Sequence, residues 1–191
     1  MSKAAVEGRV RAALTLAMAD TITIRKLGPD EADAAVPDLT DVLMDCVAGG
    51  ASVSFMEGVT RERLERFWRG VAAAVRGENR ILLVAEANGA VVGTVQLVPC
   101  PIDNQPHRAD VAKMLVTTAA RGAGVGAALM TAIEVEARAI GRTLLTLDTV
   151  TGGAGDRLYR RMGWTFVGVI PDYALFPDGK PTAATIFYKT V

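Results

Sequence analysis

One glycine-rich stretch, Arg121-Gly122-Ala-Gly124-Val-Gly126, has the residue types and spacing to bind an anion. The apolar run Val111–Val116 precedes it, and an amphipathic pattern with Leu129, Ile133 and Ile140 on one side follows it. This order predicts a strand, a tight loop and a helix. The first turn of a helix presents free backbone N–H groups and the positive end of the helix dipole, and glycines let a ligand approach the main chain. The stretch therefore predicts a site for an anion, most often a phosphate.

Two known nucleotide motifs fit this stretch less well. A P-loop needs Gly-x4-Gly-Lys-Ser/Thr, and neither Lys nor Ser/Thr follows Gly126 directly. A dinucleotide site needs Gly-x-Gly-x-x-Gly and an acid ending the next strand; the glycines here are spaced differently, although Asp148 does end the next expected strand. A single strand-helix-strand unit follows the loop, and the segment before it resembles an antiparallel hairpin. The dinucleotide site therefore stays open as a second interpretation.

Composition narrows the function classes. The 191 residues, 50% of them hydrophobic, suit one domain with a well-buried core. Lys plus Arg and Asp plus Glu number 21 each, so no net field indicates nucleic acid or a membrane surface as a partner, and no apolar run is long enough to span a membrane. One histidine and two cysteines argue against a metal site. Cys46 and Cys100 lie in apolar surroundings, as in a reduced, cytoplasmic protein.

The N-terminal residues 1–19 stand apart from the rest of the chain. Lys3, Arg9 and Arg11 precede the short apolar run Ala12–Ala19, which imitates a secretory signal. That run is brief and Glu7 interrupts the basic region, so we expect a weakly ordered, helical extension. Met18 is a candidate natural start. The single domain is expected to cover residues 20–191.

Periodicity and turn signals place the elements around the loop. Thr60 is expected to cap a helix with Leu64 and Trp68 on its apolar face, and Asn88-Gly89 predicts a tight hairpin. Strands are expected over residues 21–27, 81–86, 90–98, 107–116, 143–148, 164–170 and 184–189, and helices over 28–48 (broken or kinked at Pro37), 61–75, 125–140 and 156–162. The loop Ser52–Gly58 is either a lid facing a substrate or an ordinary connector. The fold class is α/β (α+β), a mixed and mostly antiparallel sheet flanked by helices, with one β-loop-α-β crossover.

Two motifs resemble one protein superfamily. Arg121-x-x-Gly124-x-Gly126 resembles the Arg/Gln-x-x-Gly-x-Gly/Ala signature of the GNAT N-acetyltransferases, and Leu158-Tyr159-x-x-x-Gly163-Trp164 resembles their Phe/Leu-Tyr-x-x-x-Gly-Phe element. The expected element order over residues 21–191 is similar as well. The resemblance implies that acetyl-CoA is the cosubstrate, that no metal is needed, and that the main chain holds its pyrophosphate. It implies that the cofactor contacts are Leu115, Val116, Arg121, Gly122, Ala123, Gly124, Val125, Gly126 and Ala127.

The C-terminal half resembles one branch of the superfamily more closely. His107-Arg-Ala-Asp110, Leu145-Thr-Leu-Asp148 and Phe176-Pro-Asp-Gly179 look like segments of the tabtoxin-resistance acetyltransferases, which acetylate the amine of a small amino-acid-like toxin. A small-molecule amine is therefore the expected acceptor, in a monomer or homodimer. A protein N-terminus or lysine is the alternative acceptor, and a CoA-binding module without catalysis is the alternative outside enzymes. The acceptor pocket is expected between the first two helices, the loop that joins them, and the segment Asp172–Pro181.

Acyl transfer to an amine needs a base for the ammonium, support for the oxyanion, and a proton or hydrogen bond for the departing thiolate. The resemblance implies that Asp110 and Asp148 are the acids and that Tyr159 lies near the thioester sulfur, as general acid or as a group that orients it. It also implies a backbone N–H near Val116 for the oxyanion. From the residues alone, Asp110 is equally a solvated strand residue, Asp148 a capping acid, Tyr159 a core tyrosine and Arg121 a surface arginine. Direct transfer without an acyl-enzyme is expected, because Cys100 lies off the motifs.

Overall fold

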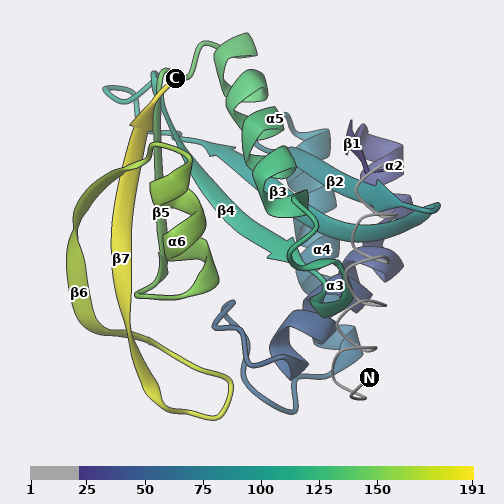
Figure 1. Ribbon diagram of the computed structural model, residues 1–191. Helices are drawn as coiled ribbons and strands as arrows, with labels where there is room; N and C mark the ends of the chain where they lie inside the picture. The colour runs from purple at the N-terminus through teal and green to yellow at the C-terminus, as the bar shows by residue number, and fades with distance from the viewer. Residues whose placement is uncertain (1–21) are drawn as a thin grey trace, which may run out of the picture.

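The fold is built on one sheet of seven strands, shown in the computed structural model, which describes residues 22–191 (Figure 1). The strands lie in the order β1-β2-β3-β4-β5-β7-β6. Neighbouring strands are antiparallel except β4 and β5, which are parallel. The strands are β1 Thr23–Lys26, β2 Ile81–Ala87, β3 Ala90–Pro99, β4 Arg108–Val116, β5 Leu144–Val150, β6 Thr165–Leu175 and β7 Pro181–Thr190. This mixed, mostly antiparallel sheet confirms the expected fold class.

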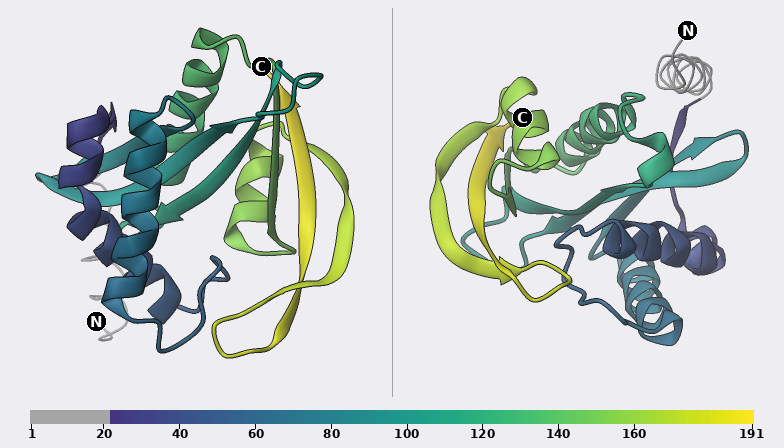
Figure 2. Two further views of the ribbon diagram at one scale, coloured as in Figure 1. Left: turned by 180° about the vertical axis from the view of Figure 1, so that it is seen from behind. Right: turned by 60° about the horizontal axis from the view of Figure 1, so that its bottom comes forward.

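Helices cover both faces of the sheet (Figure 2). The helices are α2 Pro29–Ala34, α3 Val36–Ala48, α4 Arg61–Arg76, α5 Val125–Ala139 and α6 Ala154–Arg161, with a 3-10 turn, η1, at Thr118–Ala120. Helices α3 and α4 enclose one buried cluster against the sheet, around Trp68 and Leu43. Helices α5 and α6 enclose the other cluster, around Leu129 and Phe187. We call these two sides the α3–α4 face and the α5–α6 face.

Local signals fix two of these elements as the sequence predicts. The Thr60 hydroxyl accepts a hydrogen bond from the Arg63 N–H and so begins α4. Asn88 and Gly89 both have positive φ, 52° and 77°, which a tight two-residue hairpin turn requires. The first expected helix is broken near Pro37, as expected: α2 and α3 divide at Ala35, and Pro37 lies in the first turn of α3, where its missing N–H is tolerated.

A bulge in β4 reshapes the middle of the sheet. Thr94 of β3 pairs with Leu115, but Gln96 pairs with Ala112, so β4 carries one extra residue between them. Lys113 has a φ of 49° at this point. Because of the extra residue, Val111 points to the α5–α6 face, whereas Leu115 packs into the core of the α3–α4 face.

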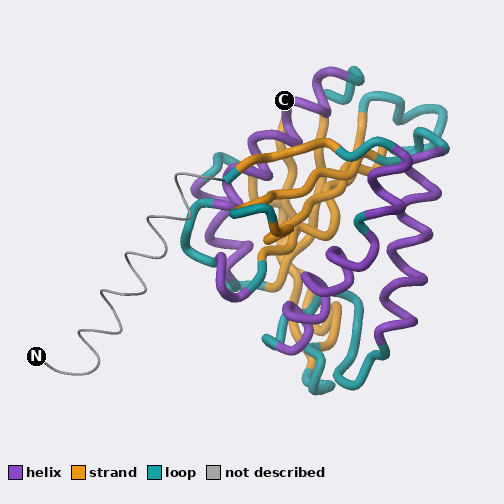
Figure 3. The backbone as a smooth tube through the Cα atoms, turned by 90° about the vertical axis from the view of Figure 1, so that its right-hand side faces the viewer, coloured by secondary structure: helices purple, strands orange, loops and turns teal. Residues whose placement is uncertain are grey.

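The parallel pair β4 and β5 separates soon after it begins. Its register runs only from Arg108 with Leu144 to Asp110 with Thr146. Beyond Asp110 the two strands diverge (Figure 1), and the tube view shows helices on both sides of the strands (Figure 3). The sheet therefore has a V-shaped opening between its two halves, next to the loop that leads into α5.

The C-terminal hairpin is longer than the sequence predicts. Strands were expected over residues 164–170 and 184–189, but β6 continues to Leu175 and β7 starts at Pro181. The register shifts between Ile170 and Ala174, and Asp172 in that interval has a φ of 50°. Pro171-Asp172 is a pair of residues that usually ends a strand, so the sequence predicts that the strand stops there. In the structure it is only an irregularity, and pairing with β7 resumes after it.

The expected extension over residues 1–19 lies outside the described residues. Within residues 22–191 all seven strands belong to one sheet, and the single domain over residues 20–191 stays a prediction. No helix in that range is long and apolar enough to cross a bilayer.

Candidate active site

The glycine-rich loop adopts a backbone that only its glycines allow without strain. Gly122 and Gly124 have φ values of 86° and 85°, in the left-handed region. Gly124 is the N-cap of α5, so the loop ends where the free N–H groups of that helix begin. Gly126 has a different role: a Cβ there would lie 3.2 Å from the Leu158 Cδ2 of α6. Close packing of α5 on α6 therefore accounts for the third glycine.

The side chains around this loop leave its main chain as the ligand-binding surface. Leu115 and Val125 are buried in the two cores, whereas Gly122 and Gly124 are exposed. The first turn of α5 contains no acidic residue, so nothing there opposes an anion. The left-handed glycines and the free start of α5 leave the main chain of residues 121–127 accessible, and the anion site there stays a prediction.

Arg121 is exposed, and its side chain folds back on the loop. Its Nε donates a hydrogen bond of 3.3 Å to the carbonyl of Val116. Its guanidinium also lies 3.6 Å from where a Cβ on Gly49 would be, at the end of α3. The Asp45 carboxylate of the same helix accepts a 2.6 Å hydrogen bond from the Thr118 N–H. The end of α3 therefore holds the start of the loop in place.

Asp110 lies at the apex of the opening and is already engaged. Arg108 Nη1 donates to Asp110 Oδ1 at 2.6 Å, and the Thr146 hydroxyl donates to the same oxygen. Arg108 also donates to Gln105 and to the sulfur of Cys100. The Asp110 side chain is nevertheless 47% exposed, so it borders the opening. The sequence analysis did not anticipate Arg108 as its partner.

Asp148 and Tyr159 lie further along the opening, and Asp148 has the freer carboxylate. Asp148 is exposed, and no hydrogen bond reaches its side chain from residues 22–191. Tyr159 is buried on α6, with Trp164 and Phe187 at ring-centroid distances of 5.8 Å and 6.0 Å. Burial raises the pKa of Tyr159, and the negative charge of Asp148 raises it further. The phenol therefore stays protonated at neutral pH and can donate a hydrogen bond.

Lys113, at the β4 bulge, borders the same opening and was not among the predicted site residues. Its ammonium donates a 2.9 Å hydrogen bond to the Ser54 hydroxyl and lies 5.7 Å from the ring centre of Phe67. Burial lowers the pKa of Lys113, the charge of Asp148 opposes this, and the charge of Arg80 adds to it. A charged residue inside the apolar run Val111–Val116 was the available sequence signal.

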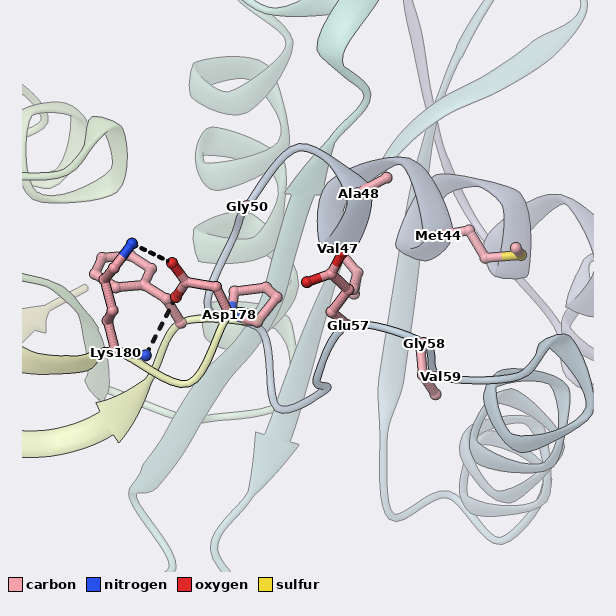
Figure 4. Close-up of a pocket in the computed structure, with 11 residues that line it drawn as sticks. Met44, Val47, Ala48, Gly50, Glu57, Gly58, Val59, Asp178 and Lys180 are labelled. Atoms are coloured by element: carbon pink, nitrogen blue, oxygen red, sulfur yellow. Dashed lines mark hydrogen bonds and ion pairs between the residues drawn. The ribbon is translucent and has the colours of Figure 1, made fainter.

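A cavity of about 720 Å³ lies on the α3–α4 face (Figure 4). It is lined by the end of α3, the loop before α4, and the turn between β6 and β7. The lining residues are Met44, Val47, Ala48, Gly50, Glu57, Gly58, Val59, Phe176, Pro177, Asp178 and Lys180. Hydrogen bonds from Ser52 Oγ to the Leu175 carbonyl (2.7 Å) and from the Glu57 N–H to the Pro177 carbonyl (3.0 Å) tie the loop to the hairpin. The first expected helix, the loop after it and the segment Asp172–Pro181 thus contribute to one cavity, whereas the second expected helix, 61–75, does not line it.

The other candidate groups lie away from this arrangement. His107 is exposed in the turn before β4, and its carbonyl accepts hydrogen bonds from the N–H groups of Thr143 and Leu144. Cys46 and Cys100 are buried free thiols, and burial raises the pKa of Cys46. Among residues 22–191 no group of three or more His, Cys, Asp or Glu is arranged to hold a metal ion.

Comparisons with known proteins agree with this geometry. The family described as "Acetyltransferase (GNAT) domain" matches residues 78–166. An uncharacterized N-acetyltransferase of Azospirillum brasilense is 36% identical over 113 residues, covering 58% of this chain and 66% of the relative. The chain thus spans just under two thirds of the length of that relative.

Solved structures share the fold. The ribosomal-protein-alanine N-acetyltransferase of Brucella melitensis has a TM-score of 0.73 at 23% identity, covering 88% of this chain and 99% of that chain. A Salmonella typhimurium protein determined with its cofactor acetyl-CoA has a TM-score of 0.71 at 20% identity, covering 89% of this chain and 94% of that chain. The family match shows a GNAT acetyltransferase domain at residues 78–166, and the likeness to these solved structures shows the same fold over most of the chain.

Proposed function

We propose that the protein transfers acetyl from acetyl-CoA directly to the amine of a small molecule. An amino-acid-like toxin or antibiotic is the proposed kind of acceptor, so that the protein would act in resistance or detoxification, in the cytoplasm, as a monomer or homodimer. One observation carries the proposal. The opening between β4 and β5 has the anion-binding loop at one end and Asp148 and Tyr159 along its sides.

The cofactor would lie across this opening. Main-chain N–H groups of residues 122–127 would hold the pyrophosphate of acetyl-CoA. The pantetheine arm would then run between the separated strands and bring the thioester to the α3–α4 face. The acetyl-CoA bound to the similar Salmonella protein supports this cosubstrate.

Asp148 is the proposed base. An alkylammonium has a pKa of about 10, so the acceptor must lose a proton before it can attack. Asp148 has no hydrogen-bond partner among residues 22–191, whereas Asp110 already accepts from Arg108 and Thr146. Asp148 would take the proton directly or through a water, and Asp110 would position Arg108 and the apex of the opening.

The chemical step needs no acyl-enzyme. The neutral amine attacks the thioester carbonyl, and a main-chain N–H near Val116 supports the oxyanion. The C–S bond then breaks, and a proton from the nitrogen, which is positively charged after the attack, passes to the departing thiolate, directly or through water, which leaves the amide and CoA thiol. Tyr159 would donate a hydrogen bond to that sulfur. Its raised pKa exceeds the value of about 8.5 for a thiol, so orienting and stabilising the thiolate suits it better than full proton transfer. The buried thiols of Cys46 and Cys100 support direct transfer.

The test is thiol release from acetyl-CoA in a screen of amines, amino acids and antibiotics, with product masses to confirm acetylation. We expect release with at least one small amine. Stabilisation by acetyl-CoA without release for any amine would instead indicate a CoA-binding module. Stabilisation by NAD but not by acetyl-CoA would indicate a dinucleotide site.

A protein acceptor is the second candidate, favoured by the name of the similar Brucella enzyme. Against it, the loop 51–59 is tied to both β4 and the β6–β7 hairpin and covers the acceptor side. Peptides that begin with alanine belong in the same screen. Faster acetylation of such peptides than of every small amine would decide for a protein acceptor.

A further inference from the structure

Lys113 is a partly buried cation in an unusual backbone conformation. Its φ of 49° is a conformation that a lysine rarely adopts, and such residues concentrate at functional sites. Its ammonium has three N–H donors, of which one reaches Ser54 Oγ at 2.9 Å. No acid lies within 4.0 Å of this ammonium among residues 22–191. A buried charge usually has a close counter-charge, so this one lacks an expected partner.

Arg80 adds a second cation on the same face of the sheet. Its Nη1 donates to Gln96 Oε1 on β3, and no ion pair forms between Arg80 and an acid among residues 22–191. The Arg80 Nε and the Gln96 Nε2 are buried, and neither has a hydrogen-bond partner within the described part of the chain. Burial lowers the pKa of Arg80. The half-buried Lys113 ammonium and the buried Arg80 Nε and Gln96 Nε2 atoms therefore have N–H donors to spare.

The charges around Lys113 do not balance. Arg80 repels the Lys113 ammonium, and Asp148 is the acid that attracts it. Asp148 is also the proposed base, so its negative charge would serve the acceptor's ammonium during the reaction. Once Asp148 interacts with the acceptor's ammonium, the positive charges of Lys113 and Arg80 face each other without a carboxylate to balance them. An anion brought by the ligand would restore the balance.

We propose that Lys113, supported by Arg80, binds an anionic group on the acceptor, so that the substrate is an amine that also carries an acid such as a carboxylate or phosphonate. This inference rests on the proposed acetyltransferase function. The ammonium of the substrate would face Asp148, and its acid would face Lys113. Because Asp148 and Lys113 are more than 4.0 Å apart, a zwitterion has room to bridge them.

The site is distinct from the one that holds the cofactor phosphates. The partners of the Lys113 side chain, Ser54 and Phe67, lie on the α3–α4 face. The glycine-rich loop, residues 121–126, instead leads into α5 on the α5–α6 face. Lys113 is thus placed to select acceptors rather than to hold CoA.

The experiment compares matched ligands that differ only in the acid. The probes are α-amino acids, their primary amides and their α-aminophosphonate analogues, with binding measured by calorimetry at saturating CoA. A pH near 6.5 keeps the amines protonated in every probe. The variants are Lys113→Met, Lys113→Arg, Arg80→Gln and Ser54→Ala. Lys26→Met is the control, because Lys26 lies far away in β1 and pairs with Glu136.

We expect an acid-bearing amine to bind more tightly than its amide. Lys113→Met should weaken binding of the acid by about 10- to 100-fold, the effect of one charged hydrogen bond, and leave the amide unchanged. Lys113→Arg should keep most of the preference for the acid over its amide, and Arg80→Gln should reduce that preference. Ser54→Ala, which keeps the Lys113 cation, and the control Lys26→Met should both preserve it.

Two results would overturn the inference. One is an amide that binds as well as its acid for every pair tested. The other is an equal loss for acid and amide in Lys113→Met, which would mean that Lys113 only holds the loop through Ser54. The proposed function can fail independently of this inference. If acid-bearing amines bind preferentially through Lys113 but no thiol is released from acetyl-CoA, the anion site is supported and the acetyltransferase function is contradicted.

Discussion

At the scale of single residues, the two acids at the opening differ in what already surrounds them. Asp110 accepts hydrogen bonds from Arg108 and Thr146, whereas no group among residues 22–191 hydrogen-bonds Asp148. A base must be free to accept the substrate proton. The environment therefore separates two residues that the sequence treats as equivalent.

Replacement of the acids tests this assignment. Asp148→Asn should lower kcat by about 100-fold or more, because the ammonium then has no base. Asp110→Asn should have a smaller effect on kcat, since it weakens the Arg108 contact without removing the base. Steady-state kinetics with the best acceptor is the measurement. A larger loss in Asp110→Asn than in Asp148→Asn would reverse the two roles, and wild-type rates in the double variant would exclude both.

Tyr159 allows a second test at this scale. Tyr159→Phe keeps the ring that packs on Trp164 and Phe187 and removes only the hydroxyl. We expect kcat to fall by about 10- to 100-fold while the Kd of acetyl-CoA changes little. Because the pKa of Tyr159 is raised, the wild-type rate should not fall through loss of the phenol proton below about pH 10. Unchanged turnover in the variant would remove Tyr159 from the mechanism.

At the scale of elements, the loop and the helix after it are the proposed cofactor site, which depends on backbone geometry. Gly124→Ala places a Cβ on a residue with a φ of 85°, which should destabilise the fold by about 1 kcal/mol and weaken acetyl-CoA binding at least tenfold. Gly70→Ala is the matched control. Gly70 is exposed inside α4 with no atom near its added Cβ, so the change should stabilise slightly and leave binding intact. Equal acetyl-CoA affinity in both variants would argue against the loop as the cofactor site.

The helix that carries Tyr159 is held by a buried carboxylate. Asp156 Oδ2 accepts from the Gly152 N–H (2.8 Å) and the Thr185 hydroxyl (3.3 Å), and its Oδ1 accepts from Arg160 Nε (2.6 Å). Burial alone would raise the pKa of Asp156, but these hydrogen bonds and the Arg160 charge outweigh it and lower the pKa. Its charged form therefore stabilises the folded state.

This arrangement predicts a pH-dependent stability. A lowered folded pKa gives a contribution that is present above the unfolded value of about 3.9 and is lost as the pH falls through the folded pKa. Asp156→Asn should reduce the free energy of unfolding by about 2 kcal/mol at pH 7, and the difference from wild type should shrink below about pH 4. Urea unfolding across pH 2–7 measures this. Asp103→Asn, in an exposed turn, should change it by less than about 0.5 kcal/mol, and a difference for Asp156→Asn that does not depend on pH would contradict the account.

At the scale of the whole molecule, local signals were enough to predict the parts of the fold that depend on neighbouring residues. The Asn88-Gly89 hairpin, the Thr60 cap and the loop before α5 follow from backbone preferences of a few residues. The bulge at Lys113 could not be predicted, because it depends on how β4 pairs with β3. The Arg108 contact to Asp110 and Thr146 likewise depends on the short pairing of β4 with β5.

Long-range contacts also decide the acceptor side. Residues 44–59 and 176–180 are far apart in the sequence, yet they enclose one cavity. In the sequence, these segments were candidates for the acceptor pocket because they carry few motifs. Only the tertiary fold brings Lys113 and Ser54 together beside them. The cavity and the Lys113–Ser54 contact therefore depend on tertiary contacts that no local sequence pattern encodes.

The most direct test of the proposed cofactor site is a crystal structure with acetyl-CoA bound. We expect the pyrophosphate to accept hydrogen bonds from main-chain N–H groups of residues 122–127. We also expect the thioester to emerge between β4 and β5, with its sulfur beside the Tyr159 hydroxyl. Acetyl-CoA bound elsewhere, or no binding at millimolar concentration, would contradict the proposed site.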